Sequence, residues 1–436
     1  MMKTFICLTL GCKVNSYESE AVRLLMLEAG FSDAGEDNVD IIIINTCSVT
    51  VTSEKKTRQL TRRYGRNYPH ALIVLMGCYA QISSAFLATL EQVKIVVGTN
   101  NRHLIPSLIK QYLIDGQPQI LIEQHQNKPI YEPLSVTSYI DQTRAYIKIQ
   151  DGCDNFCTYC IIPYTRGRLR SRNANEIIIE IGKLLDHGFQ ELVLTGIHTA
   201  GYGRDFENMS FDDLISSILA NFPNLYRLRI SSIEESEISE RFLMMLEKEP
   251  RLARHLHIPL QSGSDHILKL MNRHYNQAQF LDKVLMIKHK LPRLALTTDV
   301  IVGFPGETEQ DFNDTINVIK QIGFAKIHVF PYSPRSGTRA ENFAHPVAGK
   351  IIQQRVQTLL TLSSQLEEEY ANQFIGKALE VIIEKYNYQK AAYEGHSSNY
   401  LKVYVMGHEQ DQLKGKVIST IYQGNDRLSP IEKIVR

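Results

Sequence analysis

The chain has almost no net charge and no long apolar run. Its 436 residues carry 48 Lys and Arg against 47 Asp and Glu, a formal net charge of +1. Nucleic-acid-binding proteins often show an excess of basic residues, so any such site here must be a local patch. No apolar stretch approaches the eighteen or so residues that a membrane helix requires, and no signal-peptide pattern is present. We therefore expect a cytoplasmic protein with no membrane partner.

The cysteine count does not suit a disulfide framework. The chain has seven cysteines, an odd number, and a reducing cytosol keeps thiols free. Hydrophobic residues make up 43% and charged residues 22%, which excludes a disordered or fibrous chain. The length predicts about three domains, each able to bury its own core. The cysteines are therefore candidates for metal ligation or catalysis.

Three cysteines in the first third of the chain follow short apolar runs. The runs cover residues 4–10, 40–44 and 71–76 and lead to Cys12, Cys47 and Cys78. A fourth run covers 94–97, and helical patterns lie between the runs, which predicts a doubly wound parallel sheet. Ligands bind at the carboxyl edge of such sheets, so the three thiols should converge there. The alternative is three unrelated small core residues.

A second set of cysteines is close together in sequence. Cys153, Cys157 and Cys160 form a C-x3-C-x2-C loop, a spacing that lets one loop wrap a metal centre. A structural zinc site would need a fourth ligand, usually from a second Cys or His pair, and none follows. Three thiolates on a four-iron cluster would leave one iron open to an outside ligand. This arrangement favours catalysis over a structural role.

Strand and helix patterns alternate from residue 144 onward. Strands are predicted at 145–150, 191–195, 226–231, 255–260, 294–302 and 326–330. Six such units indicate a partial barrel, whose chemistry should lie at the carboxyl ends of the strands. The residues there that could hold a ligand are Thr195, Gly196, Ser232, Gln261, Val302 and Gly303. Each of these positions could also be only a turn, and no phosphate-binding G-x4-G-K motif is present.

A local basic patch follows the cysteine loop. Its members alternate along the chain, so an extended segment would place all four on one face; they are Arg166, Arg168, Arg170 and Arg172. We interpret them as a contact for an anionic substrate such as RNA. The alternative is a solvated or salt-bridged strand.

The last part of the chain changes pattern twice. Residues 346–374 have the spacing of a long amphipathic helix. Short alternating strands then follow at 379–384, 400–405, 413–421 and 431–436, which predicts a small antiparallel β-barrel. Such barrels often bind RNA, and Lys402, Lys414 and Lys416 are among the candidate contacts.

Over nearly its whole length the sequence resembles the radical S-adenosylmethionine (SAM) methylthiotransferases. The loop cysteines match the ligands of that family's radical cluster, and Cys12, Cys47 and Cys78 match those of its auxiliary cluster. Residues 257–264 (HIPLQSGS) and 299–308 (DVIVGFPGET) also resemble the family pattern. The final barrel resembles the TRAM domain, an RNA-binding module. The resemblance implies three domains: an N-terminal methylthiotransferase domain (1–140), a radical SAM domain (141–370) and a TRAM domain (371–436).

The resemblance also implies cofactors and a reaction. The cofactors would be two [4Fe–4S] clusters, SAM, and sulfide or polysulfide sulfur on the auxiliary cluster. In this family one SAM methylates that sulfur, and a second SAM yields the 5′-deoxyadenosyl radical that activates C2 of a purine. All six cluster cysteines would then be catalytic as well as metal ligands. Tyr159 should lie near the adenine of SAM, and the ligand-holding residues at the barrel strand ends should contact SAM.

Residues 11–15 (GCKVN) resemble the branch that acts on N6-threonylcarbamoyladenosine next to the tRNA anticodon. Residues 170–172 (RSR) and 228–234 (LRISSIE) also resemble this branch. The expected partners are that tRNA, a reduced flavodoxin or ferredoxin, and a sulfur source. Two alternatives keep the chemistry but act on isopentenyladenosine in tRNA or on a ribosomal protein side chain. A third is a non-enzymatic, metal-containing RNA-binding protein.

Overall fold

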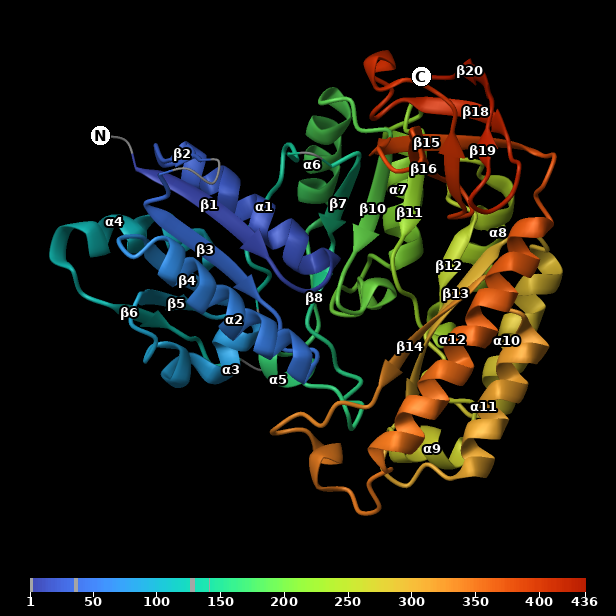
Figure 1. The fold of residues 1–436 in the computed structure, drawn as a ribbon, viewed down its shortest axis with the longest axis horizontal. Coiled ribbons are helices and arrows are strands. Elements are labelled where there is room, and N and C mark those ends of the chain that lie inside the picture. The colour runs from blue at the N-terminus through green and yellow to red at the C-terminus, as the bar shows by residue number, and fades with distance from the viewer. Residues whose placement is uncertain (1–2, 35–37, 126–129, 141) are drawn as a thin grey trace.

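The computed structural model describes residues 3–34, 38–125, 130–140 and 142–436 (Figure 1). Three regions with separate sheets follow one another along the chain, in the order that the sequence predicts. The expected boundary between the first two regions falls at residues 140 and 141, and residue 141 lies outside the described part. The division into domains at 140 and 370 stays a prediction.

The N-terminal region is a parallel sheet with helices on both faces. Its strands are β1 (Thr4–Thr9), β2 (Ser32–Asp33), β3 (Ile41–Thr46), β4 (Leu72–Gly77), β5 (Val93–Val97) and β6 (Gln119–Leu121). Their spatial order is β2-β1-β3-β4-β5-β6, and every pair is parallel. One hydrophobic cluster joins the sheet to α1 (Lys13–Glu28) and α4 (Ile105–Asp115). The other joins it to α2 (Val51–Asn67) and α3 (Cys78–Leu87), which confirms the doubly wound prediction.

The central region is an open barrel of parallel strands. The strands are β7 (Arg144–Lys148), β10 (Glu191–Thr195), β11 (Arg227–Ile230), β12 (His255–His257), β13 (Ala295–Val302) and β14 (Lys326–Pro331). They form two three-stranded sheets, β11-β10-β7 and β12-β13-β14. Isolated parallel bridges from Leu228 to Leu252 and from Ser232 to His257 join the two sheets. The six predicted strands are therefore confirmed as one partial barrel.

Helices cover the outside of the partial barrel. They are α6 (Ala174–Asp186), α7 (Phe211–Asn221), α8 (Glu240–Lys248), α9 (Asp265–Leu270), α10 (Gln277–Lys290), α11 (Glu309–Ile322) and the long α12 (Gly349–Asn372). In Figure 1, α10, α11 and α12 stand side by side, and α12 packs on β14, where the Ser363 hydroxyl accepts the Ile327 amide at 3.0 Å. A short hairpin of β8 (Gln150–Asp151) and β9 (Arg170–Ser171) brackets the cysteine loop and α5 (Ile162–Arg166).

Side chains of the barrel strands alternate between two faces. Leu228, Leu256, Val300 and Ile327 belong to the main hydrophobic core under the helices. Because successive strand residues point to opposite faces, the intervening residues line the inner face of the barrel. These inner-face residues include Arg229, His257, Thr297, Asp299 and His328. The inner face therefore carries polar and ionisable side chains. We call the space that this face borders the chamber.

The C-terminal region is a curled sheet. Its strands are β15 (Ala378–Asn387), β16 (Ala392–Ser397), β17 (Lys402–Val405), β18 (Val417–Ile421), β19 (Leu428–Ser429) and β20 (Ile431–Ile434). β19 and β20 are separated only by Pro430 but form opposite edges of the sheet, so the sheet must curl. The predicted antiparallel pairing is found between β15 and β16, β15 and β18, β16 and β17, and β18 and β20, while the short β19 pairs with β17 in parallel. Closure into a TRAM barrel stays a prediction.

This curled sheet is attached to the amino ends of the barrel strands, at the top of Figure 1. Arg144 at the start of β7 forms an ion pair of 2.7 Å with Glu384. Arg229 donates to the Ser397 carbonyl at 3.2 Å, and the Tyr400 ring stacks on His255 with centroids 4.9 Å apart. The candidate active site is therefore sought at the carboxyl ends of the barrel strands.

Short 3₁₀ turns occur between the larger elements, at Arg102–Leu104, Thr199–Gly201, Glu235–Glu237, Arg339–Asn342 and Glu409–Asp411. Of the helices in the described ranges, none combines the length and the apolar character needed to span a bilayer.

Candidate active site

The first cysteine triad lies along one edge of the N-terminal sheet. Cys12 is the residue before α1, Cys47 directly follows β3, and Cys78 is the first residue of α3. Since β1, β3 and β4 are neighbours, the three residues lie at the carboxyl ends of adjacent parallel strands. The structure therefore brings together the three residues that the sequence pattern predicts will converge.

Gly11 packs closely against the first triad. Gly11 has a φ of +114°, and a Cβ there would lie 3.1 Å from the Cys47 sulfur. A side chain at this position would therefore push into the triad. The pKa of Cys78 is raised to about 11, because burial outweighs the lowering effect of the Arg166 guanidinium. The same two opposing effects, in the same order, act on the pKa of Cys12.

The second triad lies in the loop between β8 and α5. The Cys153 sulfur accepts the Asn155 amide at 3.5 Å and lies 3.9 Å from His198 Nδ1. The Cys157 sulfur accepts from Arg273 Nη1 at 3.4 Å. Burial raises the pKa of Cys157 and Cys160, while the Arg273 charge lowers the pKa of both. The side chains of His198 and Arg273 can therefore compensate the negative charge of ionised thiolates in this loop.

Both triads fit iron–sulfur ligation. Each offers three thiolate donors, the soft ligands that iron–sulfur clusters use, and each has an arginine within electrostatic range. In the described chain, neither triad places its three sulfurs all within 4.8 Å of one another. A single zinc ion, with Zn–S bonds of about 2.3 Å, would require sulfurs closer than that. The wider spacing favours a cluster in each triad.

A buried ion-pair network connects the N-terminal sheet to the barrel. Arg166 Nη1 lies 2.8 Å from Glu18 Oε1 of α1 and 3.0 Å from Asp151 Oδ1 of β8. Lys148 of β7 contacts the same two carboxylates, at 2.7 and 2.6 Å. Arg102 Nη1 pairs with Glu18 Oε2 at 2.6 Å. Arg166 also lowers the pKa values of Cys12 and Cys78. The network therefore holds the first triad close to the loop of the second triad (residues 153–160), which we call the radical loop after the family that it resembles.

The predicted basic patch is not a shared surface. Arg166 lies in helix α5 rather than in an extended strand, and its side chain is fully buried. Arg170 pairs with Asp151 at 3.2 Å, and Arg172 pairs with Glu180 at 3.0 Å; their exposed fractions are 1% and 3%. Arg168 alone of the four is exposed. The prediction that all four share one face is therefore wrong, because internal carboxylates claim three of them.

The predicted SAM-contacting residues lie at the carboxyl ends of the barrel strands. Thr195 ends β10 and is followed by Gly196, Ser232 follows β11, and Gln261 lies beyond β12. Val302 ends β13, but its side chain is fully buried in the core under the helices. Gly303 has a φ of +76°, and a Cβ there would lie 2.4 Å from Ile352 of α12. The Val302 side chain and the Cβ position of Gly303 therefore face away from the chamber.

Tyr159 packs inside the radical loop. It contacts a small apolar cluster that contains Ile267, Met271, Phe304 and Ala340. Burial raises the pKa of its phenol far above the usual value. Tyr159 thus lies between the loop cysteines and the outer barrel, where its contact with SAM stays a prediction.

Several polar residues around the radical loop carry no sequence motif of their own. His198 forms an ion pair of 2.8 Å with Glu237, and Arg273 forms one with Glu234. Burial alone would lower the pKa of His198, but its contacts with Cys153 and Glu237 raise it to about 10. Such partners come from distant strands and helices. A position just beyond a predicted strand end could have indicated His198 and Glu234, but not Arg273, which follows α9.

Comparisons with known proteins decide the family. The model of the radical SAM superfamily matches residues 147–319, which contain the second triad. A model described as uncharacterized protein family UPF0004 matches residues 4–98, which contain the first. The threonylcarbamoyladenosine tRNA methylthiotransferase MtaB of Bacillus subtilis is 44% identical over 96% of this chain and 93% of its own length. The chain belongs to the radical SAM methylthiotransferase family.

Family membership makes the chain an enzyme whose cofactors are SAM and [4Fe–4S] clusters. The MtaB protein of Thermotoga maritima is 35% identical over 92% of this chain and 91% of its length. A tRNA-2-methylthio-N6-dimethylallyladenosine synthase of Pelotomaculum thermopropionicum is 34% identical over 88% and 87%. The solved structure of TsrM, a radical SAM methyltransferase from Kitasatospora setae, has a TM-score of 0.56 and 11% identity over 78% of this chain and 74% of TsrM. That likeness supports the fold alone.

Proposed function

We propose that the chain transfers a methylthio group to C2 of N6-threonylcarbamoyladenosine in tRNA. In this proposal Cys153, Cys157 and Cys160 hold the cluster that binds SAM. Cys12, Cys47 and Cys78 hold the auxiliary cluster with its sulfur. The observation that carries the proposal is the buried network through Arg166, which joins α1, beside the first triad, to β8 and α5, on either side of the second. When bound, the clusters and SAM supply the methyl donor, the sulfur and the radical.

The protein's own side chains orient and charge-balance the radical loop. Arg273 donates to Cys157, and Glu234 holds the Arg273 guanidinium from its other side. His198 is placed against Cys153 by its ion pair with Glu237. Each cationic group therefore stabilises a thiolate and is itself held by a carboxylate. Such second contacts fix ligand geometry and tune the metal centre.

The substrate assignment rests on the more similar relatives. The Bacillus subtilis relative, named for threonylcarbamoyladenosine, is 44% identical, whereas the relative named for dimethylallyladenosine is 34% identical. Lys13 directly follows Cys12 in sequence, within the segment 11–15 that resembles the threonylcarbamoyladenosine branch. Burial lowers the pKa of Lys13, and its side chain lies within electrostatic range of Tyr400 and Glu191, which raise that pKa.

The curled sheet offers a basic and aromatic surface for tRNA. Lys390 Nζ and Lys402 Nζ lie 4.8 and 4.9 Å from the centroid of the Tyr404 ring. Lys414 and Lys416 are exposed at the turn before β18. With the exposed Arg168 of the barrel, these residues are the proposed contacts for the tRNA backbone. Arg166, Arg170 and Arg172 support the site from inside instead.

Other partners follow from the chemistry. Reductive cleavage of SAM needs an electron donor, for which a reduced flavodoxin or ferredoxin is suited, and the transferred sulfur needs a source. The expected compartment is the cytoplasm, where tRNA is modified.

The test is the nucleoside composition of tRNA from a bacterial strain that lacks the gene. Loss of the 2-methylthio form of threonylcarbamoyladenosine, restored by the wild-type gene, is the expected result. A gene with Cys153, Cys157 and Cys160 all changed to Ala should not restore it. Cys7 provides the matched control: it lies inside β1 with its thiol 3.6 Å from the Ser19 carbonyl, so Cys7→Ala should restore the nucleoside.

Other outcomes would select the alternatives. Loss of the methylthio form of isopentenyladenosine would assign the related tRNA substrate. Unchanged tRNA with a lighter ribosomal protein would assign a protein substrate. Restoration by the triple cysteine variant would leave only a binding role for the chain.

A further inference from the structure

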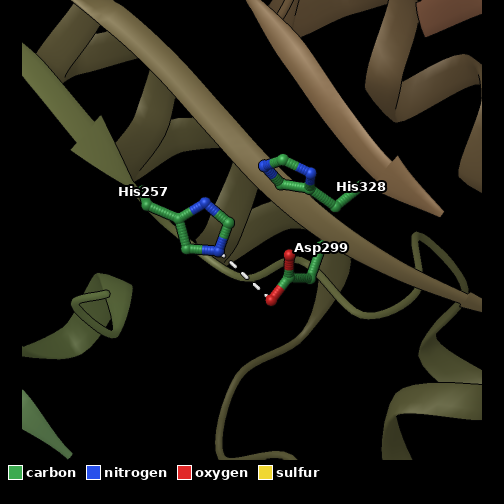
Figure 2. Close-up of side chains that lie close together, drawn as sticks. All are labelled: His257, Asp299 and His328. Atoms are coloured by element: carbon green, nitrogen blue, oxygen red, sulfur yellow. Dashed lines mark ion pairs between the residues drawn. The ribbon is translucent and has the colours of Figure 1, made fainter. Parts of the chain in front are cut away.

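Three possible metal ligands meet on the inner face of the barrel, apart from both cysteine triads. They are His257 of β12, Asp299 of β13 and His328 of β14, and one ligand atom of each lies within 4.8 Å of the others. Figure 2 shows the two rings and the carboxylate gathered at one point, with His257 Nε2 at 3.2 Å from Asp299 Oδ2. No other group of three or more His, Cys, Asp or Glu is so close within the described ranges.

The strand register places Asp299 and His328 at one level of the sheet and His257 at the level of Thr297, two residues away along β13. His257 is paired with Thr297, and Asp299 is paired directly with His328, in the parallel ladders of β12, β13 and β14. All three strands are neighbours in one sheet. Sites built on neighbouring strands hold their geometry better than sites on loops. The arrangement therefore does not depend on a mobile segment.

A hydroxyl group orients one of the rings. Thr297 Oγ1 lies 2.9 Å from His257 Nδ1 and 3.0 Å from His255 Nε2. The nitrogen of His257 that Thr297 leaves free is Nε2, which faces Asp299. Histidine ligands commonly have their other nitrogen held in this way, because the hydrogen bond fixes both the tautomer and the ring plane. Thr297 thus plays the part of a supporting residue.

The local charge suits a cation. The His328 ring lies 5.6 Å from the His257 ring, centroid to centroid, and His328 is paired with Asp299 in the strand register. Lys326 and Glu367, the other charged groups near His328, pair with each other at 3.3 Å. Asp299 is the one carboxylate of the group, and its Oδ2 lies 3.2 Å from His257 Nε2. His328 has no hydrogen-bond partner among the described residues, so its lone pair is available.

We propose that His257, Asp299 and His328 bind a single first-row divalent cation of the zinc or iron(II) type. Two imidazoles and one carboxylate are a ligand set that such ions prefer, and three protein ligands leave coordination positions open. Because the site is on the inner face, those positions face the chamber. The site contains no thiolate and does not rest on the proposed methylthio transfer.

The test uses the full-length protein with both iron–sulfur clusters reconstituted, so that the thiols are occupied. The protein is dialysed against Zn²⁺, and bound zinc and iron are counted by elemental analysis. We expect one tightly held zinc per chain in addition to the cluster iron. His328→Ala and Asp299→Asn should each weaken zinc binding about tenfold or more without changing the iron content. Thr297→Val should weaken it by about 10–100-fold, as loss of a supporting partner does.

Controls separate this site from others. His289→Ala changes an exposed histidine of α10 and should leave zinc binding unchanged. The zinc X-ray absorption spectrum should show only nitrogen and oxygen neighbours at about 2.0–2.2 Å, with no sulfur shell at about 2.3 Å. Zinc retained equally by all variants, a sulfur shell, or no retained zinc would overturn the proposal. The last result would leave His257 and Asp299 as a metal-free ion pair.

Discussion

Arg166 Nη1 lies 2.8 Å from Glu18 Oε1, and both side chains are fully buried. The pair joins α5, which directly follows the radical loop, to α1, which begins beside Cys12. An ion pair within the interior is costly to assemble and more costly to break, since a lone charge would be left without water. Because the ion pair lies between the two cysteine triads, we infer that it serves to hold them in a fixed relative position.

Replacing Arg166 with Gln should lower the free energy of unfolding by about 3–5 kcal/mol, because Glu18 and Asp151 would lose a buried partner. Urea unfolding monitored by circular dichroism measures this. The matched control is Arg168→Gln, two residues away, whose ion pair with Asp154 is about half exposed. Such surface pairs contribute about 0–1 kcal/mol. Equal losses in the two variants would contradict the buried network.

Gly152→Ala should disrupt the radical loop. Gly152 has a φ of +70°, and a Cβ there would lie 2.0 Å from the Arg168 carbonyl oxygen. The left-handed conformation alone costs an alanine about 1–2 kcal/mol, and the clash with backbone adds to this. Gly188→Ala is the control, because Gly188 has a φ of +87° but no atom near its Cβ position. We expect Gly188→Ala to lose about 1–2 kcal/mol of stability through its backbone conformation alone, and Gly152→Ala to lose more. Only Gly152→Ala should lower the iron content; normal iron content in that variant would argue against this loop geometry.

Glu191→Gln should change how stability depends on pH. Burial alone would raise the pKa of Glu191, but Arg229, Arg227 and Arg144 lower it to about 2, below its ordinary value of 4.5. A carboxyl group with a depressed pKa in the folded state stabilises the protein above pH 4.5, and this contribution is lost as the pH falls toward 2. The stability difference between wild type and variant should therefore be about 3–5 kcal/mol at pH 7 and shrink below pH 4.5. A difference independent of pH would contradict this ion pair.

Lys402→Gln should weaken tRNA binding at the curled sheet. If Lys402 contacts one phosphate, the slope of log K against log salt should fall by about one. Filter binding across a salt series measures this slope. Lys110→Gln, in α4 of the N-terminal region, is a control that should leave the slope unchanged. An unchanged slope for Lys402→Gln would remove Lys402 from the tRNA surface.

The strands and the cysteine positions could be predicted because both depend on local patterns. A short apolar run with β-branched residues and a following glycine, such as 71–76, favours a buried strand, and Cys78 follows that run after Gly77. β2 and β6 could not be predicted in this way. They are only two and three residues long, and they exist because a neighbouring strand offers hydrogen bonds.

The burial of Arg166, Arg170 and Arg172 could not be predicted from the sequence, because burial of a charged side chain is not a local property. Arg166 and Arg168 are two residues apart, yet one is fully buried and the other exposed. The difference arises from Glu18, which is far away in sequence and is brought to Arg166 by the packing of α1 on the barrel. The same holds for His257, Asp299 and His328, which only the strand register brings together.

The most direct test of the proposed methylthio transfer is detection of the labelled nucleoside product made by the reconstituted enzyme. Purified protein with both clusters is incubated anaerobically with a sulfide source, a reductant, SAM carrying a labelled methyl group, and tRNA that contains N6-threonylcarbamoyladenosine. Mass spectrometry of the nucleosides should show the label in a 2-methylthio product, together with 5′-deoxyadenosine and S-adenosylhomocysteine. Formation of 5′-deoxyadenosine with no labelled nucleoside, while tRNA containing isopentenyladenosine is methylthiolated, would contradict the assignment.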